Sequence, residues 1–462
     1  MGSLRRTGTT GGEARPGSLR RTLTFRDLLV YGLLFIAPMA PVGIFGALQA
    51  RSHGAVTTVY AVATVAMACT AYSYAQMVQV VPRAGSVYAY ARAGLGEGAG
   101  FVAGWLALLD YLLIPAVAYL FSGIALQALV PSVHRWVWTA VAVVVTTLLN
   151  LWGVRAAARV GFAVLAMEIT VLAVFVVAAA WALAAHGAER SWTAPFTGEG
   201  GFSVGAVLSA VSVAVLSYLG FDAIAAFAEE SAGGARRVAR ALLTCLVVAG
   251  VLFAVQTYLA ALLAPMPAAR LAARPGEQGT AFYTTAQAAV GVWLKTLVAA
   301  SKAIGAAFAA LAGQAAAGRL LFAMARDRRL PGALARVDGG SGVPRRALLG
   351  AAAVTLVAAV WAARRDDGLD QLSSLVNVGA LAAFALLHAS VTGWFLVRGR
   401  PPERSLVRHL VVPLLGLAVV VAVIAAASPT ARTVGAGWLA LGLVVLAWQY
   451  GRRARAGGAP GR

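Results

Sequence analysis

The hydrophobic residues of this chain are gathered in long runs, and short polar segments rich in arginine separate one run from the next. A transmembrane helix takes about 20 consecutive apolar residues, and the runs have about this length. Helices also satisfy their backbone hydrogen bonds within one segment, as hydrocarbon requires. The pattern therefore predicts an all-α polytopic membrane protein with 12 transmembrane helices, at residues 28–48, 56–81, 99–130, 136–152, 160–184, 204–228, 241–263, 288–312, 347–363, 372–397, 410–427 and 434–450.

The composition agrees with this interpretation. Of the 462 residues, 60% are hydrophobic and only 12% are charged, and the mean hydropathy is +0.79. Soluble domains carry about 25% charged residues, so a soluble enzyme or regulator is excluded. Both cysteines, Cys69 and Cys245, fall inside apolar runs, and the histidines show no ligand spacing. We therefore expect neither a disulfide nor a metal site, and no cofactor.

The distribution of arginine predicts the orientation of the chain. A net charge of +21 would suggest nucleic-acid binding if the arginines clustered on a soluble domain, but they lie between the apolar runs. With both termini cytoplasmic, 28 of the 38 Lys and Arg residues lie in tails and inner loops and 8 in outer loops. The remaining two, Lys295 and Lys302, fall in the eighth run. The positive-inside rule thus favours a plasma-membrane protein with cytoplasmic termini.

Two of the apolar runs contain helix-breaking residues at similar places. The first breaks at Ala37, Pro38, Met39, Ala40 and Pro41, and the sixth breaks at Gly220. Interrupted helices in corresponding positions of two halves are typical of transporters built from inverted repeats. A proline kink in a packed helix is the alternative. We expect a disordered cytoplasmic tail, two five-helix repeats, two additional helices and a basic cytoplasmic tail, at residues 1–22, 23–184, 204–397, 410–450 and 451–462 respectively.

A carboxylate follows the second break directly. Asp222 lies in the middle of the sixth run, and carboxylates at this depth usually face a polar cavity on an ion or substrate pathway. It could bind a cation, carry a proton, or be tied to a neighbouring hydroxyl. Asp110 in the third run is open to the same alternatives. The other candidate substrate contacts are the aromatic rings of Tyr111, Tyr218 and Phe221, suited to cation–π contact, and the amide of Asn377 in the tenth run.

One further acid and one base lie deep in apolar runs. Glu168 is midway along the fifth run and Lys302 midway along the eighth. Each would tend to lose its charge in isolation, or the two could pair if the fold brings their helices together. Such a pair would be either a structural salt bridge or a protonation switch that couples ions to transport, and the sequence leaves both open.

Several stretches together resemble the amino acid–polyamine–organocation (APC) permeases. They are Pro82 to Tyr90, Gly104-Trp105, Gly220-Phe221-Asp222, and Arg319 to Pro331. Within that family the chain looks most like the bacterial putrescine importers, through Ala37-Pro38-Met39, Gly104-Trp105 with Leu109 to Leu112, and Leu219 to Ala223. The resemblance implies a LeuT-like 5+5 inverted repeat with broken helices 1 and 6. It places the substrate between spans one, three, six, eight and ten.

The departures from the family pattern bear on the substrate. The family's first span typically offers glycine-rich backbone amides to a carboxylate, whereas Pro38 and Pro41 lack amide hydrogens. This favours an amine without a carboxylate, and Asp222 matches a position that is acidic in relatives handling polyamines, arginine or agmatine. Glu168 stands where some proton-coupled members have a lysine that mimics sodium. We therefore hypothesise that Lys302, paired with Glu168, supplies this cation instead.

The sequence thus predicts a secondary active transporter that imports a small amine such as putrescine, or an amino acid, as a proton symporter. An amino acid permease and a precursor/product exchanger of the same fold are the alternatives. No nucleotide-binding loop, nucleophile–base constellation or carbonyl-filter segment is present, which disfavours an ATP-driven pump, a membrane enzyme and a channel. The expected partners are the substrate, protons and the lipid bilayer, with no nucleic acid and no obligatory protein.

Overall fold

The computed structural model describes residues 23–82, 86–152, 154–226, 231, 233–326, 330–336, 344–398 and 405–457. Within these ranges the protein is helical and contains no strand. The predicted tail at 1–22 and the last five residues of the predicted tail at 451–462 lie outside them. The helices are α1 (Phe25–Ile36), α2 (Ala40–Arg51), α3 (Val56–Val80), α4 (Ser86–Gly94), α5 (Glu97–Leu129), α6 (Arg135–Trp152), α7 (Val154–His186), α8 (Ala194–Thr197), α9 (Val204–Ala214), η1 (Val215–Tyr218), α10 (Ala223–Ala226), α11 (Gly234–Leu262), α12 (Ala268–Ala273), α13 (Pro275–Gln278), α14 (Ala281–Ala289), α15 (Val292–Arg326), η2 (Gly332–Ala335), α16 (Arg345–Ala363), α17 (Gly368–Thr392), η3 (Gly393–Val397), η4 (Val407–Val411), α18 (Val412–Ala426) and α19 (Pro429–Gly457).

The long helices form a single bundle that confirms the prediction of an all-α polytopic membrane protein. In the described ranges, ten helical segments are long and apolar enough to cross a membrane, and the bent pair α1 and α2 makes eleven. The remaining predicted span corresponds to α6, whose apolar part is shorter. The count of 12 spans therefore stays a prediction.

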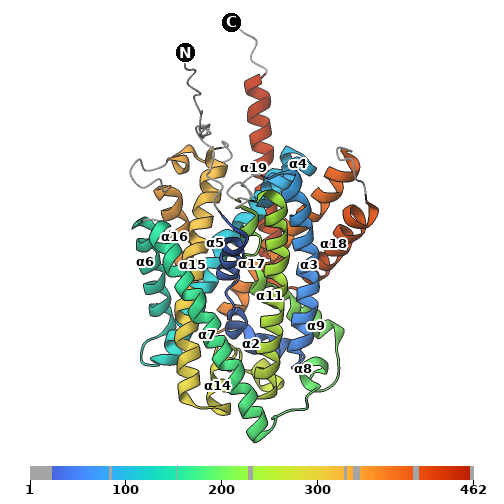
Figure 1. Ribbon diagram of the computed structural model, residues 1–462. Helices are drawn as coiled ribbons and strands as arrows, with labels where there is room; N and C mark the ends of the chain where they lie inside the picture. The colour runs from blue at the N-terminus through green and yellow to red at the C-terminus, as the bar shows by residue number, and fades with distance from the viewer. Residues whose placement is uncertain are drawn as a thin grey trace, which may run out of the picture.

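The two ends of the bundle differ in what they carry. Helix α1 begins and α19 ends at the same end, at the top of Figure 1, which we call the terminal end. The short helices α8 and α14 lie at the opposite end, which we call the loop end. Helices α12, α13 and α14 all contact α2 there, so the segment between α11 and α15 packs over the loop-end half of the first span.

The first span bends by 44° between α1 and α2. Ala37 at the bend has φ 58°, an uncommon conformation for a residue other than glycine. Pro41 occupies the second position of α2, where a backbone amide has no partner within the helix in any case. Pro41 therefore starts the second half of the span and frees no carbonyl group.

The sixth span changes conformation in the same region of the bundle. Helix α9 passes into the 3₁₀ turn η1, and the chain is extended at Leu219. Gly220 then has φ +103°, in the region that favours glycine, and a Cβ atom there would lie 3.2 Å from Phe35. The chain resumes as the short helix α10. The turn at Gly220 thus brings Asp222 against the bend of the first span.

Helix α5 lies at the centre of the packing and contacts α4, α6, α15, α16, α17 and α19. Small residues allow close approach here, as in many membrane bundles. The Cβ position of Gly313 on α15 lies 3.2 Å from Pro115, and that of Gly379 on α17 lies 3.1 Å from Leu109. Helix α5 therefore provides a fixed wall for the site described below.

Candidate functional site

A cavity of about 90 Å³ lies where the bend of the first span faces the turn at Gly220. This is room for several water molecules or for a small organic ion. Most of the lining is apolar, and it includes Phe35 and Ile36 of α1 and Gly313 and Ala316 of α15. Phe35 and Ile36 are the last two residues of α1, next to the bend, and Gly313 and Ala316 lie in the half of α15 nearer the terminal end. The polar and charged side chains of the lining are Asp110, Tyr111, Asp222 and Lys302.

Asp222 is held in place by tyrosine hydroxyl groups from two other helices. The hydroxyl of Tyr111 donates a hydrogen bond of 3.0 Å to Oδ2, and that of Tyr74 donates one of 3.4 Å to the same atom. Tyr74 in turn accepts a bond of 3.2 Å from Ser86. Asp222 is 4% exposed. Because hydroxyl donors stabilise the ionised form, this arrangement suits a carboxylate that binds a cation.

Asp110 reaches the cavity from α5 and has a different environment. It is 7% exposed, and its Oδ1 has no hydrogen-bond partner within the protein. Its neighbour Tyr111 donates a hydrogen bond to Asp222. Two consecutive residues of α5 therefore provide one carboxylate of the cavity and a hydrogen-bond donor to the other. A buried polar atom without a partner costs free energy, about 1–3 kcal/mol for a neutral group, and calls for an explanation.

Lys302 fastens the bend of the first span to α15. Its ammonium donates a hydrogen bond of 3.1 Å to the carbonyl oxygen of Met39, and it lies 4.9 Å from the ring centroid of Phe121. The neighbouring Ser301 donates to the sulfur of Met39 at 3.4 Å. The cation thus lies at the bend, where the chain passes from α1 to α2.

Glu168 approaches the same region from α7 but does not line the cavity. A Cβ atom at Gly305 of α15 would lie 2.0 Å from its Oε1, so the carboxylate packs against α15 about one turn from Lys302. Its Oε1 has no hydrogen-bond partner within the protein, and no ion pair within 4.0 Å joins Glu168 to Lys302 among the described residues. The lysine contacts the backbone of the first span instead.

The other predicted substrate contacts divide into two groups. Ala37, Ala40 and Gly220 line the cavity along with Tyr111. The side chains of Tyr218 and Phe221, in contrast, pack in the core. Tyr218 shares a bond of 2.7 Å with Thr64, and the ring of Phe221 lies 5.7 Å from that of Tyr74.

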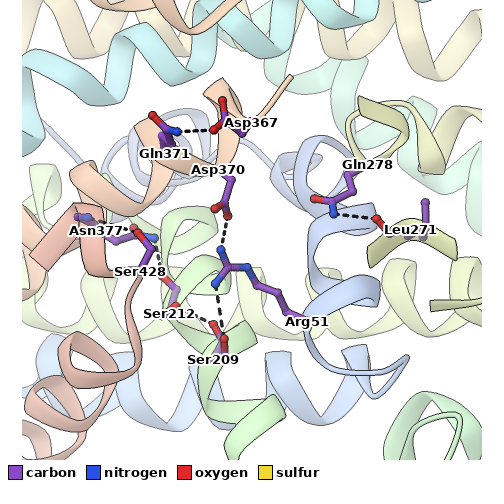
Figure 2. Close-up of polar contacts among 11 residues, drawn as sticks. Arg51, Ser209, Ser212, Leu271, Gln278, Asp367, Asp370, Gln371, Asn377 and Ser428 are labelled. Carbon is purple, nitrogen blue, oxygen red and sulfur yellow. Dashed lines mark hydrogen bonds and ion pairs between the residues drawn. The ribbon is translucent and has the colours of Figure 1, made fainter. Parts of the chain in front are cut away.

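Four further predicted residues, Pro38, Met39, Pro41 and Asn377, also lie outside the lining. The carbonyl of Pro38 accepts a bond of 2.9 Å from Gln256. The amide of Asn377 donates to the Ser212 carbonyl at 2.6 Å, which ties α17 to α9 (Figure 2).

The site contains residues that the sequence analysis did not select. Tyr74 and Ser86 support Asp222, and Ser301 and Phe121 surround the contact between Lys302 and Met39. Hydroxyl and aromatic residues are frequent in the apolar runs, so the sequence carries no signal that separates these from core residues. No group of three His, Cys, Asp or Glu side chains in the described ranges could hold a metal ion.

The loop end is closed by a polar cluster that joins three helices (Figure 2). Arg51, the last residue of α2, forms an ion pair with Asp370 in the first turn of α17, and its guanidinium donates to Ser209 of α9 at 3.5 Å. The side chains of Arg51 and Asp370 are 23% and 32% exposed. The structure thus holds α2, α9 and α17 together on the loop side of the cavity.

Replacing Arg51 by alanine should weaken this closure and expose residues beneath it. Ser373 lines the loop-end pocket beside Asp370 and is buried. In a background without Cys69 and Cys245, we expect a Ser373→Cys variant to react several-fold faster with a membrane-impermeant maleimide once Arg51→Ala is added. Arg432→Ala, also at the loop end, is the matched control. Equal reaction rates with and without Arg51 would contradict a role of the ion pair in closure.

Comparison with known proteins agrees with this architecture. A family model described as "Amino acid permease" matches residues 29–439. The low-affinity putrescine importer PlaP of Escherichia coli K12 is 28% identical over 435 residues, 93% of each chain. The branched-chain amino acid permease BcaP of Bacillus subtilis is 28% identical, covering 85% of this chain and 84% of its own. An uncharacterized transporter of Mycobacterium tuberculosis is 33% identical, covering 94% and 92%. The chain therefore belongs to the amino acid permease family of the APC superfamily, and it is a multi-pass membrane transporter rather than an enzyme.

Proposed function

We propose that this permease imports a small organic cation, with putrescine as the first candidate, across the plasma membrane with protons as the driving ion. The observation that carries the proposal is Asp222, a carboxylate that lines a mostly apolar cavity and is held by two tyrosines. An ammonium group fits such a site because a charge-assisted hydrogen bond to a buried carboxylate is strong. Tyr111 adds an aromatic ring beside the bound cation.

Two further observations support an amine over an amino acid. The bend of the first span carries Pro38 and Pro41, which lack the amide hydrogens that would bind a carboxylate. The relative PlaP is named as a putrescine importer. The arginine distribution supports a cytoplasmic position for the terminal end.

Lys302 and Glu168 are the proposed coupling residues. The ammonium of Lys302 supplies a fixed positive charge at the bend, where it holds the carbonyl of Met39. Glu168 packs against the same helix and has an unpartnered oxygen that could accept a proton when α7 and α15 shift. Protonation of this pair would then bias the position of α1.

An amino acid substrate is the second candidate, and the charges of the cavity favour it specifically. Lys302 lines the cavity together with Asp222, so a zwitterion could place its ammonium on one and its carboxylate near the other. The relative BcaP is named as a branched-chain amino acid permease. Exchange of one substrate for another would use the same site.

Uptake into proteoliposomes tests the proposal. The purified protein is reconstituted, a pH gradient is imposed, and labelled putrescine, arginine, leucine and agmatine are compared. We expect gradient-driven accumulation of putrescine, inhibited by unlabelled diamines and abolished by a protonophore. Accumulation of leucine without putrescine uptake would overturn the amine substrate. Dependence on internal substrate would indicate an exchanger.

A further inference from the structure

Asp110 has a property that the proposed function does not use. It is the second carboxylate of the cavity, more than nine-tenths buried, and its Oδ1 has no partner within the protein. Asp222, in contrast, accepts hydrogen bonds from Tyr111 and Tyr74. Two carboxylates that share a small apolar cavity cannot both stay ionised without a large cost, so one of them takes up a proton.

The donors around the two carboxylates decide which one is protonated. Hydroxyl groups that donate to Asp222 stabilise its negative charge. No such donor reaches Oδ1 of Asp110. A proton on this oxygen would make Asp110 a neutral carboxylic acid and remove a buried charge that no donor stabilises. The hydroxyl hydrogen of Tyr111 is donated to Asp222, so it is not available to the adjacent Asp110.

The other charged and titratable groups around Asp110 do not change this assignment. Those that face the cavity region are Asp222, Tyr111 of its own helix, Tyr74 of α3, Tyr90 of α4 and Lys302 of α15. Helix α17 carries Asp370 at its first turn and His388 bonded to Ser73. Helices α6, α16 and α19 carry their titratable residues only near their ends. The ammonium of Lys302 is directed to the carbonyl of Met39.

We infer that Asp110 binds the proton that travels with the substrate, while Asp222 binds the substrate's ammonium group. This inference rests on the proposed function. The proton enters from the outer aqueous phase onto a carboxylate oxygen of Asp110 and leaves from it to the cytoplasm, with no covalent step. In the loaded cavity Asp222 offsets one ammonium group of the substrate, and neutral Asp110 adds no charge; Lys302 and the second ammonium group of a diamine keep their positive charges. Glu168 does not line the cavity, so a proton that it takes up acts on the position of α1 through Lys302 and is not the proton carried with the substrate.

Counterflow and pH-gradient-driven uptake together distinguish a residue that carries the proton from one that binds the substrate. In proteoliposomes, Asp110→Asn is expected to keep counterflow of labelled putrescine within about threefold of wild type and to lose its stimulation by a pH gradient. Asp110→Glu, which retains a carboxyl group, should recover part of the stimulation. Asp222→Asn should lose both modes. A pH-gradient stimulation that survives in Asp110→Asn would overturn the inference and leave the proposed function intact.

Infrared spectroscopy tests whether Asp110 is protonated when no substrate is present. The carbonyl stretch of protonated carboxyl groups is recorded at neutral pH for the full chain in nanodiscs, after size-exclusion chromatography has shown each variant to be monodisperse. We expect this band to lose intensity in Asp110→Asn and to be retained in Asp222→Asn. An unchanged band in Asp110→Asn would show that Asp110 is ionised and would overturn the inference, even if no tested compound is transported.

Discussion

Uptake of putrescine should fall by at least about 100-fold when Asp222 is replaced by asparagine. The substitution keeps the shape of the side chain and removes the charge that pairs with the ammonium. Removing one partner of a buried ion pair costs about 3–5 kcal/mol, and each 1.4 kcal/mol is a factor of ten. The measurement is kcat/KM for labelled putrescine in proteoliposomes, together with its binding affinity in detergent.

Graded and matched variants show whether the loss is specific. Tyr111→Phe removes one of the hydroxyl donors to Asp222 and should cost about tenfold, since a hydrogen bond to a charged group contributes about 1.5–3 kcal/mol. Asp366→Asn removes a carboxylate that is 90% exposed at the loop end, and it should leave uptake unchanged. Wild-type transport by Asp222→Asn would show that this carboxylate has a structural role only.

The second large effect is expected at Lys302. Lys302→Ala removes the charged donor to the carbonyl of Met39 at the bend of the first span, and that carbonyl keeps only the bond of 3.1 Å from the backbone N–H of Val42. We expect both counterflow and gradient-driven uptake to be lost, because the position of α1 relative to α15 is no longer held. The thermal unfolding midpoint in detergent should also fall, since the lost hydrogen bond involves a charged donor.

Lys295 provides the matched control for Lys302. It lies on the same helix, two turns earlier, is only partly buried, and does not line the cavity. Lys295→Ala should retain uptake and stability. If Lys302→Ala instead kept full uptake and an unchanged pH profile, Lys302 would have no part in coupling. We expect Lys302→Ala to lose counterflow and gradient-driven uptake, and Asp110→Asn to lose only the stimulation by the gradient. This difference would show that Lys302 holds the bend and that Asp110 carries the proton.

The fold was predictable from the sequence because hydrocarbon imposes a simple rule. Every spanning segment needs a run of apolar residues that forms a helix, so the runs reveal the helices directly. The exception is α6, whose apolar part is short for a span. The sequence also identified Asp222, because a charge in an apolar run is rare enough to be informative.

The partners of the charged residues could not be predicted in the same way. The sequence suggested Glu168 as the partner of Lys302, whereas the ammonium donates to a backbone carbonyl, an acceptor that every residue carries. Tyr74 was not selected because tyrosines are ordinary core residues, and only the packing of α3 against the turn at Gly220 brings its hydroxyl to Asp222. Side-chain direction depends on packing, which a single sequence does not contain.

The last helix is joined to the wall of the cavity by a pair of tryptophans. Nε1 of Trp105 on α5 donates to the carbonyl of Trp438 on α19 at 2.8 Å, and Nε1 of Trp438 donates to the carbonyl of Trp105 at the same distance. The two rings are stacked with centroids 4.6 Å apart. Each indole N–H therefore donates to a backbone carbonyl of the other helix. Trp105 lies five residues before Asp110 on α5. The wall of the cavity and the last helix are therefore tied to each other at this point, through contacts that do not involve the bent first span.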